Sequence, residues 1–182
     1  AAVERNGHVL LLPAWPGSGK TTLSAMLMHH GYRLFSDEFG LMEPQSGEFY
    51  PLPRLMPLKN QSIEVVRNRL PEAMLGPEIP GTLKGTVAHI CPTQASIERS
   101  DETARPRWIV FPKWSAGAAV RLEPLPQSEA FLLLATNAFN YEVLGKTAFN
   151  AVTSLVRGCE CRKLVYSDFD EALAVLNALT DG

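Results

Sequence analysis

Short apolar runs alternate along the chain with longer amphipathic segments and with turns rich in glycine and proline. A continuous apolar run bounded by turn signals is typical of a buried strand, whereas apolar residues that recur every three or four positions indicate a helix. The runs typical of strands comprise 9–13, 32–36, 85–91, 108–111, 119–122 and 163–166, and the helical segments comprise 20–30, 61–70, 128–157 and a last helix after 167. This alternation predicts a mixed α/β fold with a central sheet and flanking helices.

Local signals place the ends of the helices. Gly31 is well placed to end the first helix, and Ser128 opens the long helical stretch, which is interrupted near Asn140 and Gly145. Ser167 is a candidate N-cap of the last helix, because acidic residues follow it where the helix dipole favours negative charge.

The segments between these elements are rich in turn formers. Residues 40–50 read as a hairpin around the turn 44–47, and three prolines make 51–57 extended and loop-like. Residues 92–106 are polar and predict an exposed loop. No internal repeat or low-complexity linker divides the chain, so 1–182 is expected to form a single domain. The chain begins almost on a strand, so this domain is also compatible with being one portion of a longer protein.

Composition narrows the range of partners. The 182 residues carry a net charge of −2, so charge gives no reason to expect nucleic acid or an anionic membrane as a partner. No apolar run approaches the roughly 20 residues that span a bilayer, and the polar residues 3–7 do not belong to a secretion signal. Three cysteines, an odd number, favour the reducing cytoplasm, with Cys159 and Cys161 as structural thiols rather than zinc ligands.

The strongest chemical signal is a glycine-rich loop between the first apolar run and the first helix, over Ala14–Thr21. Gly17 and Gly19 allow unusual torsions that turn backbone N–H groups toward phosphate oxygens. Lys20 supplies a cation for the β- and γ-phosphates, and Thr21 supplies a hydroxyl for Mg²⁺. The residues expected to contact the nucleotide are Pro16, Gly17, Ser18, Gly19, Lys20, Thr21 and Thr22.

The loop departs from the usual pattern G-x-x-x-x-G-K-[ST] at its first position, where Ala14 replaces glycine. The alternative is a glycine-rich turn followed by Lys-Thr by chance. Strand, glycines, Lys-Thr and amphipathic helix all agree, however, and this context favours a site for a nucleoside triphosphate, ATP with Mg²⁺.

Asp37 and Glu38 form the second signal, at the end of the run 32–36. A carboxylate at the C-terminal end of a strand that neighbours the phosphate loop can hold Mg²⁺ or act as a base. The alternative is an exposed acidic turn. Beside the loop, a catalytic role is the favoured interpretation for at least one of the two.

The sequence PGSGKTTLSAMLMHHGYRLFSDEFGLM resembles the HPr kinase/phosphorylase group, in which one helix separates the phosphate loop from an acidic pair on the next strand. PEP carboxykinases share this general P-loop fold. The later sequences PLKNQSIEVV, LKGTVAHI, WIVFPKW, VRLEPL and YSDFDEAL are more similar to the HPr-kinase-related kinase A group than to true HPr kinases.

The resemblance implies roles for individual residues. Lys20 and Thr21 would hold phosphates and metal, Asp37 would accept the proton of the attacking hydroxyl, and Glu38 would assist in positioning the metal or the proton. True HPr kinases supply a further Glu from a segment that ends in Arg-Gly. The nearest match is 82–85, Thr-Leu-Lys-Gly, in which that Glu is missing and Arg is replaced by Lys84.

Other side chains are weaker candidates. A second cation at the transferred phosphoryl group would stabilise transition-state charge, although each candidate can equally be a solvated surface charge. The candidate cations are Lys59, Lys84, Lys113 and Arg121. Trp15 is a candidate for contact with the base or ribose and Trp114 for a substrate pocket, with simple packing as the alternative for both. His89 is interpreted as structural.

The expected function is a magnesium-dependent kinase that transfers the γ-phosphoryl group of ATP to a hydroxyl, a serine of a protein or peptide by resemblance. One alternative is a small-molecule kinase on the same scaffold, because the acceptor-binding residues would lie in loops such as 44–57 and 92–106. The other is a regulatory module that binds ATP without transfer. The sequence indicates neither the acceptor nor the oligomeric state.

Overall fold

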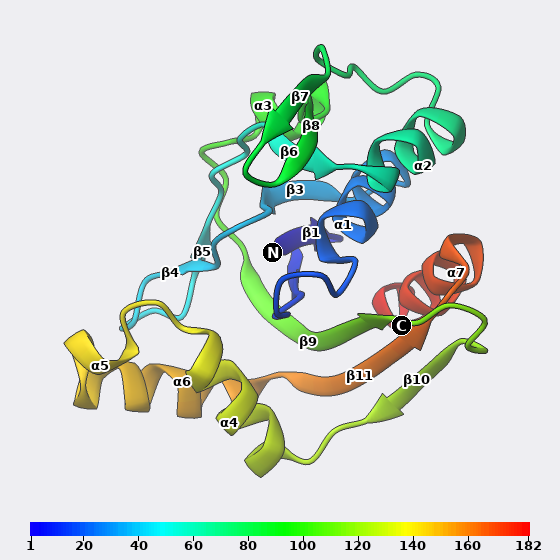
Figure 1. Cartoon of the computed structure of the whole chain (residues 1–182). Coiled ribbons are helices and arrows are strands. Elements are labelled where there is room, and N and C mark those ends of the chain that lie inside the picture. Colours follow the sequence, from blue (N-terminus) through cyan, green and yellow to red (C-terminus); the bar gives the residue numbers. More distant parts are fainter.

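A computed structural model describes all residues, 1–182, and has a six-stranded mixed sheet at its centre (Figure 1). The strand order is β10-β11-β9-β2-β1-β3. The strands are β1 (Ala2–Arg5), β2 (His8–Leu11), β3 (Arg33–Ser36), β9 (Arg105–Trp114), β10 (Arg121–Pro124) and β11 (Glu160–Tyr166). β2, β9 and β11 are mutually parallel, and β3 runs in the same direction because it is antiparallel to β1, which is antiparallel to β2.

Two hydrophobic clusters cover the two faces of this sheet. One face packs against α1 (Lys20–His29), α2 (Gln61–Arg69) and α7 (Phe169–Asp181), and the other packs against α4 (Gln127–Asn137) and α6 (Lys146–Gly158). Figure 1 shows α4, α6 and the short α5 (Tyr141–Leu144) on the side opposite α1. The fold is therefore a mixed α/β structure with a central mixed sheet and flanking helices, as the sequence pattern predicts.

Smaller elements surround the central sheet. A three-stranded sheet, β6-β8-β7, packs on α1 through β6 and consists of β6 (Met56–Lys59), β8 (Gly85–Ile90) and β7 (Ile79–Thr82). β4 (Leu41–Met42) and β5 (Phe49–Tyr50) form the expected hairpin. The short α3 (Gln94–Glu98) follows β8. None of the helices combines the length and apolar character that crossing a membrane requires.

The N-terminal hairpin of β1 and β2 was not predicted. Asn6 and Gly7 both have positive φ, 55° and 80°, as the two central residues of a type I′ turn require. Asn-Gly is a strong hairpin signal, but the polar character of residues 3–7 obscured the strand before it. Glu4 of β1 and Arg33 of β3 are both buried, and Nε of Arg33 donates to Oε2 of Glu4 at 2.7 Å.

Most predicted elements are confirmed, and the differences follow from tertiary contacts. β6 lies partly in the segment expected to be a loop, since β8 pairs with it from Met56 to Lys59. The predicted exposed loop 92–106 contains α3 and the start of β9, and the Ser96 hydroxyl in it is buried and accepts from the backbone N–H of Leu34. Asp168, not Ser167, caps α7, because its carboxylate accepts from the first-turn N–H groups.

His29 near the end of α1 predicts a loss of stability in mild acid. Burial lowers the pKa of this imidazole below 6.5, and Glu72, 3.4 Å away, opposes the shift only in part. Because the unfolded chain binds the proton more readily, this contribution to stability is complete above pH 6.5 and is lost as the pH falls through the lower, folded-state pKa. Urea unfolding between pH 7.5 and 5 should therefore show a smaller decline for His29→Gln than for the wild type. His30→Gln, which changes an exposed histidine, is the control and should decline as the wild type does. The same decline in His29→Gln as in the wild type would show that His29 does not cause the loss of stability in acid.

Candidate phosphate-binding site

The parallel strands bring four chain segments to one edge of the central sheet. β2, β3, β9 and β11 all end there, followed by the glycine-rich loop, Asp37, the residues after Trp114 and Ser167 respectively. The C-terminal edge of such a sheet is where α/β folds place their ligand sites. β1 lies between β2 and β3, with Ala2 paired to Leu11 on one side and Ser36 on the other. Asp37 is therefore two strands away from the loop strand, a correction to the expectation that its strand neighbours the loop.

The loop presents unused hydrogen-bond donors. Gly17 and Gly19 have φ of 87° and 84°, the left-handed conformation that glycine adopts without strain. No acceptor within the chain is available to the backbone N–H groups of Gly17, Gly19, Lys20, Thr21 and Thr22. The Ser18 hydroxyl is likewise buried without a partner. Such an array of donors at the start of a helix fits an anion.

Lys20 and Thr21 both contact Asp37. Nζ of Lys20 donates to the backbone oxygen of Asp37 and lies 3.3 Å from Oδ1 of its carboxylate. Oγ1 of Thr21 donates to Oδ2 of the same carboxylate at 3.0 Å. The side chain of Asp37 is only 6% exposed. The start of α1 brings Lys20 and Thr21 to Asp37, although β1 lies between β2, which leads into the loop, and β3, which ends just before Asp37.

Trp114 and Tyr166 support the loop from the ends of β9 and β11, a role the sequence analysis missed for Tyr166. The backbone N–H of Trp114 donates to Ser18 O at 3.0 Å, and the Tyr166 hydroxyl donates to Gly19 O at 3.4 Å. The indole N–H of Trp114 donates to Ser167 O at 3.1 Å. Both aromatics end strands that the sequence pattern predicts, but only the parallel pairing of β9 with β11 brings them together at the loop.

Gly19 is packed too closely to accept a side chain. A Cβ there would lie 2.9 Å from the Tyr166 hydroxyl and 3.0 Å from Cβ of Trp114. Gly19→Ala should therefore displace the loop and weaken the binding of a phosphate-bearing ligand roughly tenfold or more, the equivalent of losing one charge-assisted hydrogen bond. Isothermal titration with ATP and Mg²⁺ as the probe measures this. Gly47→Ala is the matched control, since Gly47 has φ of 73° but open space around it and should keep wild-type affinity; equal losses in both variants would contradict the packing argument.

The weaker cation candidates separate into two groups. Lys59 and Lys84 lie together at one end of the small sheet, where the Asn60 side chain contacts Lys84 O and the backbone of Thr86. Lys113 and Arg121 are both in register with Val165 in the central sheet. Side chains alternate along a strand, so these two point to the α4 and α6 face, away from Trp114 and Tyr166. All four are exposed and form no ion pair.

Other predicted residues fall in different places. Trp15 is 60% exposed, so it does not pack within the protein and stays a candidate for contact with a ligand. His89 lies in β8 opposite Pro57, within the small sheet. The segment 82–85 is the tight turn between β7 and β8, with Lys84 exposed in it. Cys159 and Cys161 are buried, and burial raises the pKa of Cys159 to about 12, which favours neutral structural thiols.

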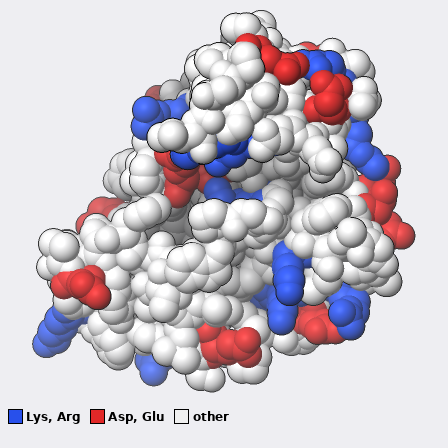
Figure 2. All heavy atoms as spheres, in the orientation of Figure 1, with Lys and Arg blue, Asp and Glu red and all other residues white.

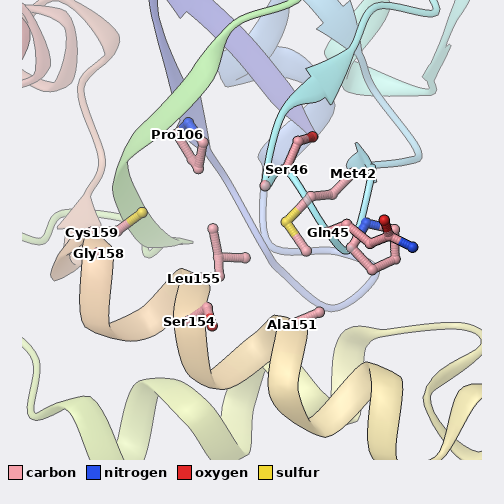
Figure 3. Close-up of a pocket in the computed structure, with 11 residues that line it drawn as sticks. Met42, Gln45, Ser46, Pro106, Ala151, Ser154, Leu155, Gly158 and Cys159 are labelled. Atoms are coloured by element: carbon pink, nitrogen blue, oxygen red, sulfur yellow. The ribbon is translucent and has the colours of Figure 1, made fainter.

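The molecular surface is hollowed on the side of the phosphate loop. Figure 2 shows a hollow near the middle of this face, with Lys and Arg atoms inside it and on its upper rim and with Asp and Glu atoms beside it. A separate cavity of about 220 Å³ lies between the β4–β5 turn and α6 (Figure 3). It is lined by residues such as Met42, Gln45, Ser154 and Leu155 and by no residue of the phosphate loop.

The site also fits Mg²⁺ bound together with a nucleotide. Mg²⁺ prefers oxygen ligands and typically takes only one or two carboxylates from the protein, with the rest from phosphates and water. Thr21 Oγ1 and Asp37 Oδ2 are such oxygens and lie 3.0 Å apart. The chain gathers no group of three His, Cys, Asp or Glu side chains that could hold a metal by themselves.

Comparison of the chain with protein-family models, with curated proteins and with solved structures gives no match.

Proposed function

We propose that this protein is an ATP-dependent, magnesium-requiring kinase of the P-loop type that phosphorylates a hydroxyl group. The observation that carries the proposal is the convergence of Lys20, Thr21 and Asp37 beside a row of unused backbone N–H groups. A polyphosphate would supply the acceptors those donors lack, and a chance glycine-rich turn gives no reason for a buried carboxylate at this place.

In the proposed reaction the loop amides and Lys20 bind the phosphates of ATP and stabilise the charge that develops on the transferred group. Thr21 and Asp37 would hold Mg²⁺, which neutralises phosphate charge when bound. One carboxylate of the acidic pair, Asp37 or Glu38, orients the hydroxyl of the acceptor. A serine of a protein or peptide is the acceptor that the sequence resemblance favours.

Radiolabelled ATP offers a direct test. The protein is incubated with γ-labelled ATP and Mg²⁺ and with separate panels of serine- and threonine-containing peptides and of small hydroxyl metabolites. A labelled phosphoester together with ADP is the expected result, and the panel in which it forms separates a protein kinase from a small-molecule kinase. Binding of ATP without any labelled product would instead favour a regulatory module. Absence of ATP binding in the presence of Mg²⁺ would overturn the proposal.

A further inference from the structure

Asp37 and Glu38 are adjacent in sequence but lie in opposite environments. Asp37 is buried, and each of its carboxylate oxygens accepts from a loop side chain, Oδ1 from Lys20 and Oδ2 from Thr21. Glu38 is exposed, and its carboxylate forms no hydrogen bond and no ion pair. The two acids are therefore not interchangeable.

Ser36 produces this difference at the end of β3. Its buried hydroxyl accepts from the backbone N–H groups of Glu38 at 3.3 Å and of Phe39 at 3.1 Å. A serine that bonds to the backbone two and three residues ahead turns the chain out of its strand. The turn leaves Asp37 beneath the loop and places Glu38 in solvent, with its Cα about 3.8 Å from that of Asp37.

We propose that the two carboxylates divide the work of the kinase: Asp37, with Thr21, holds Mg²⁺, and Glu38 accepts the proton of the attacking hydroxyl. This inference rests on the proposed kinase function and reverses the order of roles that the family resemblance implies. Lys20 and Thr21, the residues that face phosphate and metal, contact both oxygens of the buried Asp37 carboxylate, which places this group on the metal side of the site. Glu38 has a free carboxylate on a longer side chain and is open to an incoming acceptor.

The proposed transfer forms one bond to phosphorus and breaks one. The acceptor oxygen forms a bond to the γ-phosphorus while the bond from that phosphorus to the β–γ bridging oxygen breaks. ADP leaves with the electron pair of the broken bond. The proton of the acceptor hydroxyl passes to the carboxylate of Glu38. When water takes the place of the acceptor, the same step is ATP hydrolysis, which needs no identified partner.

Two variants separate the roles through ATP binding and turnover. Titration of Mg²⁺ at fixed ATP, followed by calorimetry, should show that Asp37→Asn needs about 10- to 100-fold more Mg²⁺ for half-maximal ATP binding. Glu38→Gln should bind ATP with the wild-type dependence on Mg²⁺ but lose about 10²- to 10⁴-fold in ATP hydrolysis or transfer. The matched control is Glu142→Gln, another exposed glutamate, on α5, which should behave as wild type in both assays.

Thermal unfolding of the ligand-free variants adds a readout that does not depend on activity. Asp37→Asn should change the unfolding midpoint, since Lys20 loses its charged partner, and Glu38→Gln should not. Two results would overturn the division of roles but leave the kinase proposal intact. One is a wild-type rate of ATP hydrolysis in Glu38→Gln. The other is an increased Mg²⁺ requirement for ATP binding in Glu38→Gln but not in Asp37→Asn. Wild-type protein that binds Mg²⁺ and ATP but turns over neither water nor acceptor would overturn the role of Glu38. No ATP binding at all would overturn both proposals.

Discussion

Lys20→Met is expected to abolish phosphoryl transfer, with a fall of about 10³-fold or more, comparable to the loss of a key transition-state donor in other enzymes. The ammonium group is the one cation whose contacts fix it beside the loop and Asp37. The methionine keeps the length and apolar stem of the side chain, so the change removes little but the charge. Initial rates of labelled phosphoester formation or ATP hydrolysis measure the effect.

The control for Lys20→Met separates catalysis from folding. Lys20→Met also leaves the buried Asp37 carboxylate without its ion-pair partner, which lowers stability. Lys20→Met/Asp37→Asn should recover the thermal midpoint but neither ATP binding nor turnover. Lys146→Met, which removes an exposed lysine on α6, should leave the rate unchanged. A Lys20→Met protein that is folded and turns over ATP within tenfold of wild type would contradict the assignment of the phosphate site.

The second large effect concerns stability. Arg33→Met should lower the free energy of unfolding by about 3–5 kcal/mol, the usual result of removing one partner from a buried ion pair. Arg33 and Glu4 are each 4% exposed, and Nη1 of Arg33 also donates to the carbonyl oxygens of Arg99 and Glu102. The variant leaves these acceptors and a buried carboxylate unpaired. Urea unfolding at neutral pH, analysed for both midpoint and slope, measures the loss.

A double variant tests whether the unpaired charge is the cause. Glu4→Gln/Arg33→Met should be more stable than Arg33→Met alone, because the glutamine is neutral and its oxygen can still accept from the Gly7 N–H, as Glu4 does at 2.7 Å. Arg67→Met, which removes exposed ion pairs with Glu64 and Glu78, should change stability little. Equal losses in the free energy of unfolding for Arg33→Met and Arg67→Met would show that the buried ion pair contributes no more to stability than the exposed ones.

Elements with a strong local pattern were predictable from the sequence. α1 and α2 combine helical spacing with clear ends, and β3 and β8 are short apolar runs between turns, so each appears near its predicted place. Elements that depend on a distant partner were missed or shortened. β6 contains a proline and is a strand only because β8 pairs with it, and β9 extends from Arg105 to Trp114 because β2 and β11 flank it.

The residues of the candidate site likewise separate into those that local sequence predicts and those that depend on distant partners. Lys20, Thr21 and Asp37 were predictable as a group, because a glycine-rich loop, one helix and one strand determine their order along the chain. The contact of Tyr166 with Gly19 joins residues 147 positions apart and has no local signature. The separation of Lys113 and Arg121 from the loop likewise depends on strand register, which a single sequence does not reveal.

The sequence by itself determined which chemical groups are available: a loop with glycines where positive φ is needed, a lysine and a threonine at the start of a helix, and two acids after the next strand. Local backbone preferences and side-chain chemistry are enough for that, since each acts over a few residues. Only the tertiary structure decided how the acids are used. The insertion of β1 between β2 and β3, and the turn at Ser36, bury Asp37 against Lys20 and Thr21 and leave Glu38 free in solvent. Burial and pairing depend on elements that meet only in the folded chain, and for that reason adjacent carboxylates that look equivalent in the sequence are not equivalent in the protein.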